Sequence, residues 1–129
     1  MPENTEKIDH PAHYNSLPHE VISIVGYMSF AKGNAVKYLM RAPFKGAYDE
    51  DLRKAQWYLH WIDEHYAGYE PIDPQRQQMI EDNIKALGDR TELTYPLHLI
   101  ALDFWHLARN SLDAAIKLRE KEKENDGQE

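Results

Sequence analysis

Apolar residues recur along this chain at helical spacing, in segments separated by proline, glycine and clusters of polar residues. A first helix is predicted from Pro18 to about Phe30, because proline suits a first helical turn and apolar residues follow it. Gly33 permits a break in the chain, and a second helix follows it. That helix is predicted to end before Pro43, which disfavours helical geometry at Ala42.

The third and fourth predicted helices each begin at an aspartate. Asp49 is a suitable N-cap, and the helix that follows it is predicted to run to about Tyr66. Asp73 followed by Pro74 is a good cap and first-turn pair, and Gly88 is predicted to end the fourth helix. No segment of useful length alternates apolar and polar residues in the way that a strand does.

A last, long helix is predicted to open at residues 94–96, and its apolar residues cover nearly half of its circumference. Such a wide apolar surface, together with Trp57 and Trp61 on the less buried side of the third helix, predicts subunit contacts and a homo-oligomer. A larger core within one chain is the alternative. Residues 119–129 carry charges without an apolar anchor and are predicted to form a flexible charged tail.

These elements predict an all-α protein, a compact bundle of about five helices preceded by a loop rich in histidine and proline. The chain has 129 residues and 42% hydrophobic content, which is enough to bury one core. We therefore expect a single domain over residues 1–129.

Charge and composition narrow the classes of function. The formal net charge of -7 argues against general binding of duplex DNA, which relies on clustered cations that release counterions. The chain has no cysteine, which excludes disulfides and thiolate-bound zinc and is compatible with a reducing cytoplasm. It also has no long apolar run and no basic-then-apolar leader, so we expect a cytoplasmic protein that does not enter a membrane.

The second predicted helix carries a cationic polar stripe. Asn34, Lys37, Tyr38 and Arg41 fall on about a third of its circumference, and Lys45 follows a few residues after the helix end. Cations that face one direction can hold a multiply charged anion such as a phosphate chain. The alternative is a solvated helix face whose cations offset an acidic surface.

The third predicted helix carries a matching polar stripe of Asp51, Lys54, Tyr58 and His65. If the second and third helices form a hairpin, the two stripes border one cleft. Asp51 then either pairs with a cation or holds the magnesium that accompanies nucleoside polyphosphates. Elsewhere on this helix, His60 and Asp63 fall largely opposite the apolar stripe and are expected to face water.

Four motifs occur in order: DHPAHY (9–14), HEVISIV (19–25), FAKGNAVKYLMRAPFKG (30–46) and EDLRKAQWYL (50–59). Together they resemble a family of small, largely phage-encoded domains regarded as nucleotide-kinase-like, which includes a coliphage deoxynucleoside monophosphate kinase. The resemblance implies a nucleotide-binding core over residues 8–66. Residues 67–118 lie beyond the resemblance and are expected to form a helical C-terminal extension. The resemblance also implies a phage protein that works in the cytoplasm of its host.

The activity that this resemblance implies is phosphoryl transfer between nucleotides. No GxxxxGK[ST] sequence occurs, so the kinase would lack a P-loop. Transfer depends mainly on alignment and on neutralising the charge of the transferring group. Lys37, Arg41 and Asp51 are the expected catalytic residues, Lys45 is expected to help clamp the phosphates, and Glu20 or Asp51 is expected to position Mg²⁺.

The remaining residues of the implied site recognise the nucleotide. His10 or Tyr14 is expected to stack on the base, and Asn34 to bind the base edge or the sugar. The full set of expected nucleotide-binding residues is His10, His13, Tyr14, Asn34, Lys45, Lys54 and Tyr58. His10 and His13 can alternatively bind a metal, although no clear third ligand accompanies them. Alternative functions are a protein that sequesters nucleotides without catalysis, or an inhibitor of a host enzyme.

Overall fold

The computed structural model describes residues 17–65 and 70–127. Within these ranges the protein has six α-helices, one short 3₁₀ helix and no strand, which confirms the predicted all-α class. The helices are α2 (Val21–Val25), α3 (Phe30–Arg41), α4 (Tyr48–Glu64), α5 (Pro74–Leu87), α6 (Thr91–Ala101) and α7 (Trp105–Gly127), with η2 (Ala42–Phe44) after α3. No helix in the described part of the chain is long and apolar enough to cross a bilayer.

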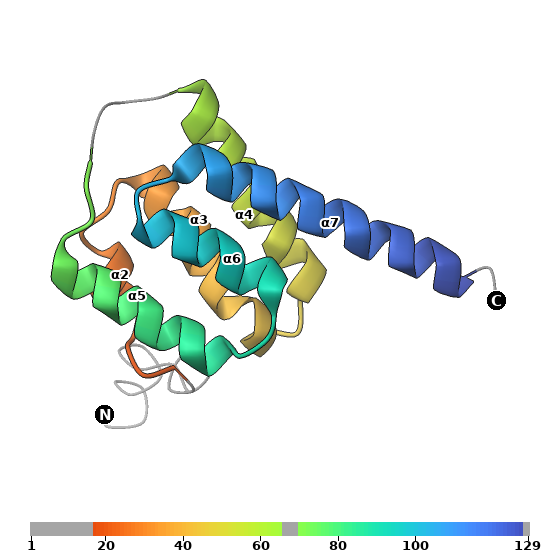
Figure 1. Ribbon diagram of the computed structural model, residues 1–129, viewed down its shortest axis with the longest axis horizontal. Coiled ribbons are helices and arrows are strands. Elements are labelled where there is room, and N and C mark those ends of the chain that lie inside the picture. The colour runs from red at the N-terminus through yellow and green to blue at the C-terminus, as the bar shows by residue number, and fades with distance from the viewer. Residues whose placement is uncertain (1–16, 66–69, 128–129) are drawn as a thin grey trace, which may run out of the picture.

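The helices pack as two connected pairs (Figure 1). α3 and α4 form a hairpin, with η2 in the connection between them, so the condition for two stripes that border one surface is met. α6 and α7 form a second pair, which packs on the first through α4 and α7. α5 lies against α6, and the short α2 contacts α3 and α5. The C-terminal half of α7 projects beyond the other helices.

One apolar core joins these helices. Every helix from α2 to α7 contributes buried apolar residues to it, which is the single core expected of a chain of this length. Burying each large aliphatic side chain contributes about 1.5–3 kcal/mol to stability. The largest fully buried side chains are Ile24, Val36, Leu39, Met40, Leu52, Leu59, Ile80, Leu87, Leu93, Leu97, Ile100 and Leu112.

The first interruption of the helical chain is at residues 26–29, and the prediction that it falls at Gly33 is wrong. Gly33 lies buried inside α3. A Cβ atom added there would lie 3.3 Å from the carbonyl oxygen of Val25, so the glycine lets the end of α2 approach α3 closely. The break instead follows Gly26, and α3 begins after Ser29, whose N–H donates to Glu70 at 3.0 Å.

A second interruption divides the predicted last helix into α6 and α7. Asp103 adopts a φ of 65°, a left-handed conformation that ends a helix and that aspartate tolerates better than most residues. Its carboxylate also accepts a hydrogen bond from Trp105 Nε1 at 2.8 Å, which fixes the corner. Pro96, which was expected to open the helix, lies inside α6, and that helix begins at Thr91.

The predicted start of α5 is confirmed. The Asp73 side chain accepts a hydrogen bond from the N–H of Arg76 at 3.0 Å, and Pro74 occupies the first turn. Gly88 ends the helix with a φ of 73°. At α4 the predicted cap is wrong by two residues, because the N-cap is Ala47 and its side chain makes no capping bond.

Histidine and aspartate side chains connect α4 to α7. His60 Nε2 lies 2.9 Å from Asp113, and His106 Nδ1 lies 2.8 Å from Asp63. His60 and Asp63, which the sequence predicts to face water, are only partly exposed, because each pairs with a side chain on α7. The contact between α4 and α7 is therefore polar at its edge and apolar at its centre.

Asp49 anchors the distal part of α7. Its carboxylate accepts a hydrogen bond from Arg119 Nε at 3.0 Å and another from Lys123 Nζ. The sequence predicts a flexible charged tail from residue 119 onward. Residues 119–127 instead lie in α7, and at least two of them contact α4. The hydrogen bond from Lys123, with a further contribution from Arg119, holds the pKa of Asp49 below its usual value despite partial burial.

Asp49→Asn is expected to raise the amide hydrogen exchange rates of residues 119–127 several-fold, because the carboxylate that holds both cations is removed. In the unchanged protein the same loosening is expected in acid. A lowered pKa means that the stabilisation is present above about pH 4 and is lost as pH falls through the lower value of the folded state. Asp89→Asn, an exposed aspartate outside α7, is the control. Unchanged exchange in Asp49→Asn would show that the remaining contacts, which include the ion pairs Arg53–Glu120 and Arg119–Glu92, hold this part of the helix without Asp49.

Candidate functional site

Three cations surround the ring of Tyr38 on the outer side of the α3–α4 hairpin. Lys37 Nζ lies 4.6 Å from the ring centroid, Arg41 Cζ lies 5.0 Å from it, and Lys54 Nζ lies 5.3 Å from it. Lys37 and Arg41 come from α3, whereas Lys54 comes from α4. The stripes that the sequence predicts on two separate helices therefore meet at one aromatic ring.

Two of these cations are held by carboxylates. Arg41 Nε lies 3.2 Å from Asp51 Oδ2, and Asp51 is completely buried. Lys54 Nζ lies 3.1 Å from Glu50, and this hydrogen bond is the main reason that the pKa of Lys54 is raised. Lys37 has no carboxylate partner among the described residues. Of the two roles that the sequence left open for Asp51, pairing with a cation is the one observed.

Aromatic rings extend this surface. Tyr58 stacks on Tyr38 with a centroid distance of 6.1 Å and an interplanar angle of 11°. Phe30 and Trp57 meet Tyr58 edge-on at 6.0 Å and 5.1 Å. Phe30 is 77% exposed and Trp57 is 60% exposed, which is unusual for such large apolar rings. We call the surface formed by Phe30, Lys37, Tyr38, Arg41, Lys54, Trp57 and Tyr58 the cationic-aromatic face.

A hollow adjoins the cationic-aromatic face along α4. It has a volume of about 490 Å³ and is wide open to solvent. Trp57 belongs to both surfaces, and Trp61 lies one turn further along the hollow. The whole lining consists of Arg53, Gln56, Trp57, His60, Trp61 and Glu64. A flat aromatic ligand could therefore reach an exposed indole while its charged end lies near Lys54.

Phe30, Tyr38 and Trp57 are the members of this face that were not predicted as site residues, although Tyr38 was placed on the polar stripe of the second predicted helix. Phe30, Asn34 and Tyr38 follow one another at intervals of four residues, which places them on one side of α3. Trp57 precedes Tyr58, which was included. Both signals are present in the sequence, but apolar rings at such positions usually indicate core packing.

The remaining predicted site residues are distributed as follows. Asn34 Nδ2 donates to the carbonyl oxygen of Phe30 at 3.0 Å, and Lys45 is exposed directly after η2. Glu20 is the N-cap residue of α2. The expected residues His10, His13 and Tyr14 lie outside the described residues.

The described residues do not form a metal site on their own. No group of three or more His, Asp or Glu side chains in this part of the chain is placed to hold an ion. Asp51, an expected magnesium ligand, is buried and has one oxygen beside Arg41, although its other oxygen has no hydrogen-bond partner among the described residues. The expected role of Glu20 or Asp51 in positioning magnesium therefore stays a prediction.

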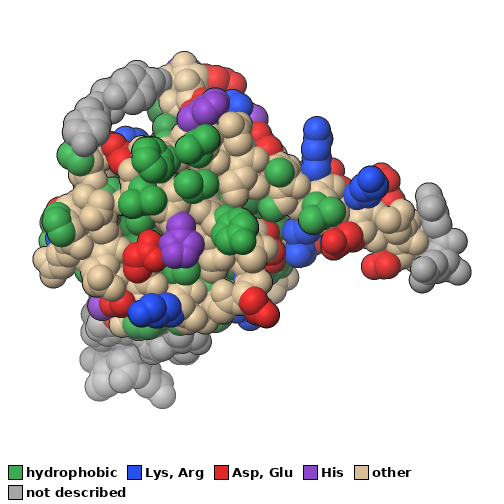
Figure 2. All heavy atoms as spheres, viewed as in Figure 1, with side chains coloured by type: hydrophobic (Ala, Val, Ile, Leu, Met, Phe, Trp, Pro, Cys, Tyr) green, Lys and Arg blue, Asp and Glu red, His purple; other side chains and the backbone are tan. Residues whose placement is uncertain are grey.

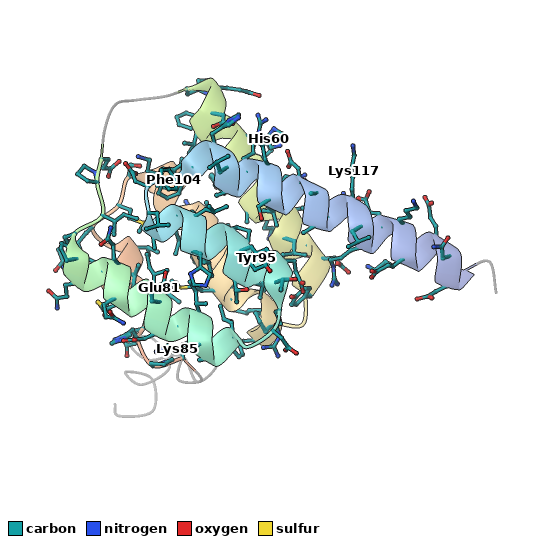
Figure 3. All side chains as sticks on the ribbon, in the orientation of Figure 1. His60, Glu81, Lys85, Tyr95, Phe104 and Lys117 are labelled. Atoms are coloured by element: carbon teal, nitrogen blue, oxygen red, sulfur yellow. The ribbon has the colours of Figure 1, made fainter. Side chains whose placement is uncertain are left out.

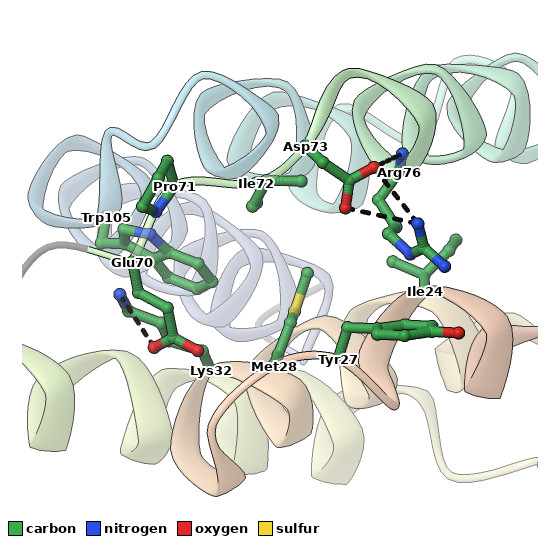
Figure 4. A pocket seen from close by; sticks show the side chains of 10 residues that line it. All are labelled: Ile24, Tyr27, Met28, Lys32, Glu70, Pro71, Ile72, Asp73, Arg76 and Trp105. Carbon is green, nitrogen blue, oxygen red and sulfur yellow. Dashed lines mark hydrogen bonds and ion pairs between the residues drawn. The ribbon is translucent and has the colours of Figure 1, made fainter.

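A smaller cavity lies on another side of the molecule, between the start of α3, the start of α5 and Trp105 (Figure 4). Its volume of about 40 Å³ is enough for a few water molecules. An ion pair between Lys32 and Glu70, with 3.6 Å between the charged atoms, lies at one end, and Arg76 beside Asp73 lies at the other. Because each cation already has a carboxylate partner, we interpret this cavity as part of the packing between the helices.

The fold and this surface define an all-α protein with a cationic and aromatic face on a helical hairpin. Residues 8–60 match the model of a family described as a protein of unknown function (DUF3310). The match spans less than half of the chain but includes every residue of the cationic-aromatic face. The comparisons with curated proteins and with solved structures each gave no match.

This match corrects the resemblance described above. The motifs between residues 9 and 59 were compared with nucleotide-kinase-like domains, but the family that this region matches has no assigned function. The assignment to a nucleotide-kinase-like family is therefore wrong. Any nucleotide function must be argued from the side chains themselves.

Proposed function

We propose that the protein binds a nucleotide on the cationic-aromatic face. The observation that carries this proposal is the convergence of Lys37, Arg41 and Lys54 within 5.3 Å of the Tyr38 ring centroid. The chain as a whole has a formal net charge of -7, so three cations around one ring form a local exception. Cations supply phosphate contacts, and exposed aromatic rings supply stacking surfaces for a base.

Each part of a nucleotide has a suitable partner on this face. Lys37 has no carboxylate partner in the described part of the chain, and Lys54 is paired only with the exposed Glu50, so both ammonium groups are available to phosphate oxygens. Arg41 is fixed by Asp51 and supplies a positive charge in a constant position. Trp57 is exposed beside the hollow and offers its ring to the base.

Magnesium is proposed only as a companion of the nucleotide. Mg²⁺ commonly binds phosphate oxygens and water together with one or two carboxylates. Glu50, which is exposed next to Lys54, is better placed to meet such an ion than the buried Asp51. Binding of a triphosphate is therefore expected with and without Mg²⁺.

A protein that binds nucleotides on this face could either transfer a phosphoryl group between them or sequester them without reaction. Both need a bound nucleotide, but only transfer needs a second nucleotide aligned with the first. Incubation of labelled nucleoside monophosphates with ATP and Mg²⁺ distinguishes them. Formation of a diphosphate indicates transfer, whereas reversible binding without product indicates sequestration. We further propose that the protein acts in the cytoplasm, where nucleotides are present, and as a homo-oligomer.

Lys37→Ala and Lys54→Ala are each expected to weaken binding of a nucleoside triphosphate by about tenfold to a hundredfold, the value of one charged hydrogen bond. Isothermal titration calorimetry with ATP and dTTP measures this loss, and inorganic triphosphate reports the phosphate contribution alone. Both lysines lie near the surface, so folding is expected to be unchanged.

Lys85→Ala is the matched control, because Lys85 is an exposed lysine on α5, away from the cationic-aromatic face. Equal losses in Lys85→Ala and Lys37→Ala would indicate non-specific attraction and would contradict the proposed site. Absence of binding by the unchanged protein to any nucleotide tested would reject the function itself.

A further inference from the structure

A second apolar surface lies on the side of α6 and α7 that faces the viewer in Figure 2. Tyr95 and Phe104 lie on this side in Figure 3. Large apolar side chains that are about half exposed or more gather here, and such patches on a folded protein usually mark contact surfaces. They are Tyr95 at 61%, Leu102 at 59%, Phe104 at 49%, Leu107 at 50% and Leu118 at 58% exposure.

The spacing on α7 shows that this surface is a second helix-packing stripe. The core-facing residues of the helix are Trp105, Ala108, Leu112 and Ile116, all of which are buried. The exposed stripe lies about 120° around the helix axis from them, by the rotation of 100° per residue. It consists of Phe104, which directly precedes α7, and of Leu107, Ser111, Ala114 and Leu118 in α7, at alternating intervals of three and four residues. This alternation is the pattern by which one helix packs lengthwise on another.

The exposed stripe is nearly symmetric about Ser111. Phe104 and Leu118 lie seven residues before and after it, and small side chains at Ser111 and Ala114 occupy the middle. Two copies of such a stripe fit each other when the helices run antiparallel, because each large residue then meets the opposite end of the other copy. Small residues at the centre let the helix axes approach closely.

The charges beside the stripe suit the same arrangement. In an antiparallel pair centred on Ser111, Lys117 of one copy lies close to Asp103 of the second copy, and Asn110 lies close to Asn110 of the second copy. Lys117 is exposed and has no ion-pair partner among the described residues. Asp103 keeps a carboxylate at the corner between α6 and α7.

The α6 helix widens this surface. α6 and α7 pack side by side (Figure 1), so Tyr95 of α6, and Leu102 in the corner after it, lie exposed next to α7. A contact between two α7 helices alone is narrow, and the added α6 surface brings it closer to the roughly 800 Å² per partner of a stable interface.

We propose that two copies of this chain associate through this surface, with antiparallel α7 helices whose twofold axis passes near Ser111. The proposal rests on the homo-oligomer proposed above and specifies its geometry, and it does not depend on nucleotide binding. The occupant of the exposed stripe is therefore a second copy of the same chain.

The first test measures mass in solution by light scattering after size exclusion. The unchanged protein is expected to be a dimer or a larger even-numbered assembly, and Leu118→Glu is expected to reduce its size by removing this contact. Ile22→Glu is the control, because Ile22 is 64% exposed on α2, away from the stripe, and should leave the mass unchanged. A monomeric unchanged protein would overturn both the homo-oligomer and its geometry.

The second test uses single cysteines, which report cleanly because the chain has none. Ser111→Cys is expected to form a disulfide-linked dimer on mild oxidation, since only residues near the twofold axis face themselves. Leu107→Cys is expected to remain unlinked, because the two copies of this position lie about 12 Å apart along the axis. A disulfide needs Cα atoms within about 7 Å.

The cysteine variants also separate this geometry from the homo-oligomer in general. Equal cross-linking of Ser111→Cys, Leu107→Cys and Leu118→Cys would indicate parallel helices and overturn the antiparallel pair. A dimer in solution without cross-linking of Ser111→Cys would retain the homo-oligomer and reject this surface. Leu118→Glu without any change in mass would reject it as well.

Discussion

Replacing Arg41 with alanine is expected to lower the free energy of unfolding by about 3 to 5 kcal/mol, the usual cost of removing one partner from a buried ion pair. Asp51 is completely buried, and Arg41, whose Nε lies 3.2 Å from Asp51 Oδ2, is the only cation of the described residues that forms an ion pair with it. One Asp51 oxygen already lacks a hydrogen-bond partner in this part of the chain, so losing Arg41 leaves the carboxylate still less satisfied. Urea unfolding measures the change.

Two further variants test the cause of this loss. Arg41→Ala combined with Asp51→Asn is expected to be more stable than Arg41→Ala alone, because the uncompensated buried charge is absent. Arg53→Ala is the matched control. Arg53 is 60% exposed in its ion pair with Glu120, so the expected cost is below about 1 kcal/mol. A small effect of Arg41→Ala, equal to that of Arg53→Ala, would show that Asp51 does not need its partner.

The expected instability of Arg41→Ala makes this variant unsuitable for testing nucleotide binding. Arg41 lies on the cationic-aromatic face, but its substitution is expected to damage the hairpin that forms the face. Loss of nucleotide binding in Arg41→Ala would therefore be ambiguous. Lys37 and Lys54 are the informative positions, because neither is paired with a buried carboxylate.

Asn83→Ala is expected to lower the free energy of unfolding by about 2 to 4 kcal/mol, through lost hydrogen bonds and a small cavity. Asn83 is completely buried on α5. Its Oδ1 accepts from the N–H of His19 at 3.0 Å, and its Nδ2 donates to the carbonyl oxygen of His19 at 3.0 Å. The substitution leaves both backbone groups of His19 without these partners, so the segment before α2 is held less firmly.

Thermal and urea unfolding measure this effect, and hydrogen exchange of residues 19–25 reports where it occurs. Gln75→Ala is the control, because Gln75 is exposed on the same helix and is expected to change stability by less than about 0.5 kcal/mol. Equal stability of the two variants would show that water replaces the Asn83 side chain at His19. Loss of stability without faster exchange at 19–25 would assign the effect to the core instead.

The helices of this protein were largely predictable because their signals are local. Asp73, Pro74 and Gly88 mark the two ends of α5 by preferences that act within one turn. The positions of the two interruptions were not predictable in the same way. Gly33 has the same local preference as any glycine, and only the approach of α2 to α3 decides that it serves packing inside a helix.

The candidate site likewise has features that local spacing predicts and features that only the packing of the helices decides. The helical repeat alone places Lys37, Tyr38 and Arg41 on one side of α3, and Lys54 and Tyr58 on one side of α4. The sequence left open whether Asp51 pairs with a basic side chain or binds magnesium. Its burial favours the first role, and burial is a property of the packed hairpin. The exposure of Phe30 and Trp57 is likewise decided by which neighbours cover them.

The sequence by itself determined the all-α class and the residues that form the cationic stripes of α3 and α4. Each of these follows from residue spacing and from side-chain preferences that act over a few residues. The tertiary structure alone decided that Arg41 is held by Asp51, that α7 begins at a corner formed by Asp103, and that one stripe of α7 stays uncovered. These features depend on contacts between segments distant in the chain, and local spacing carries no information about such contacts.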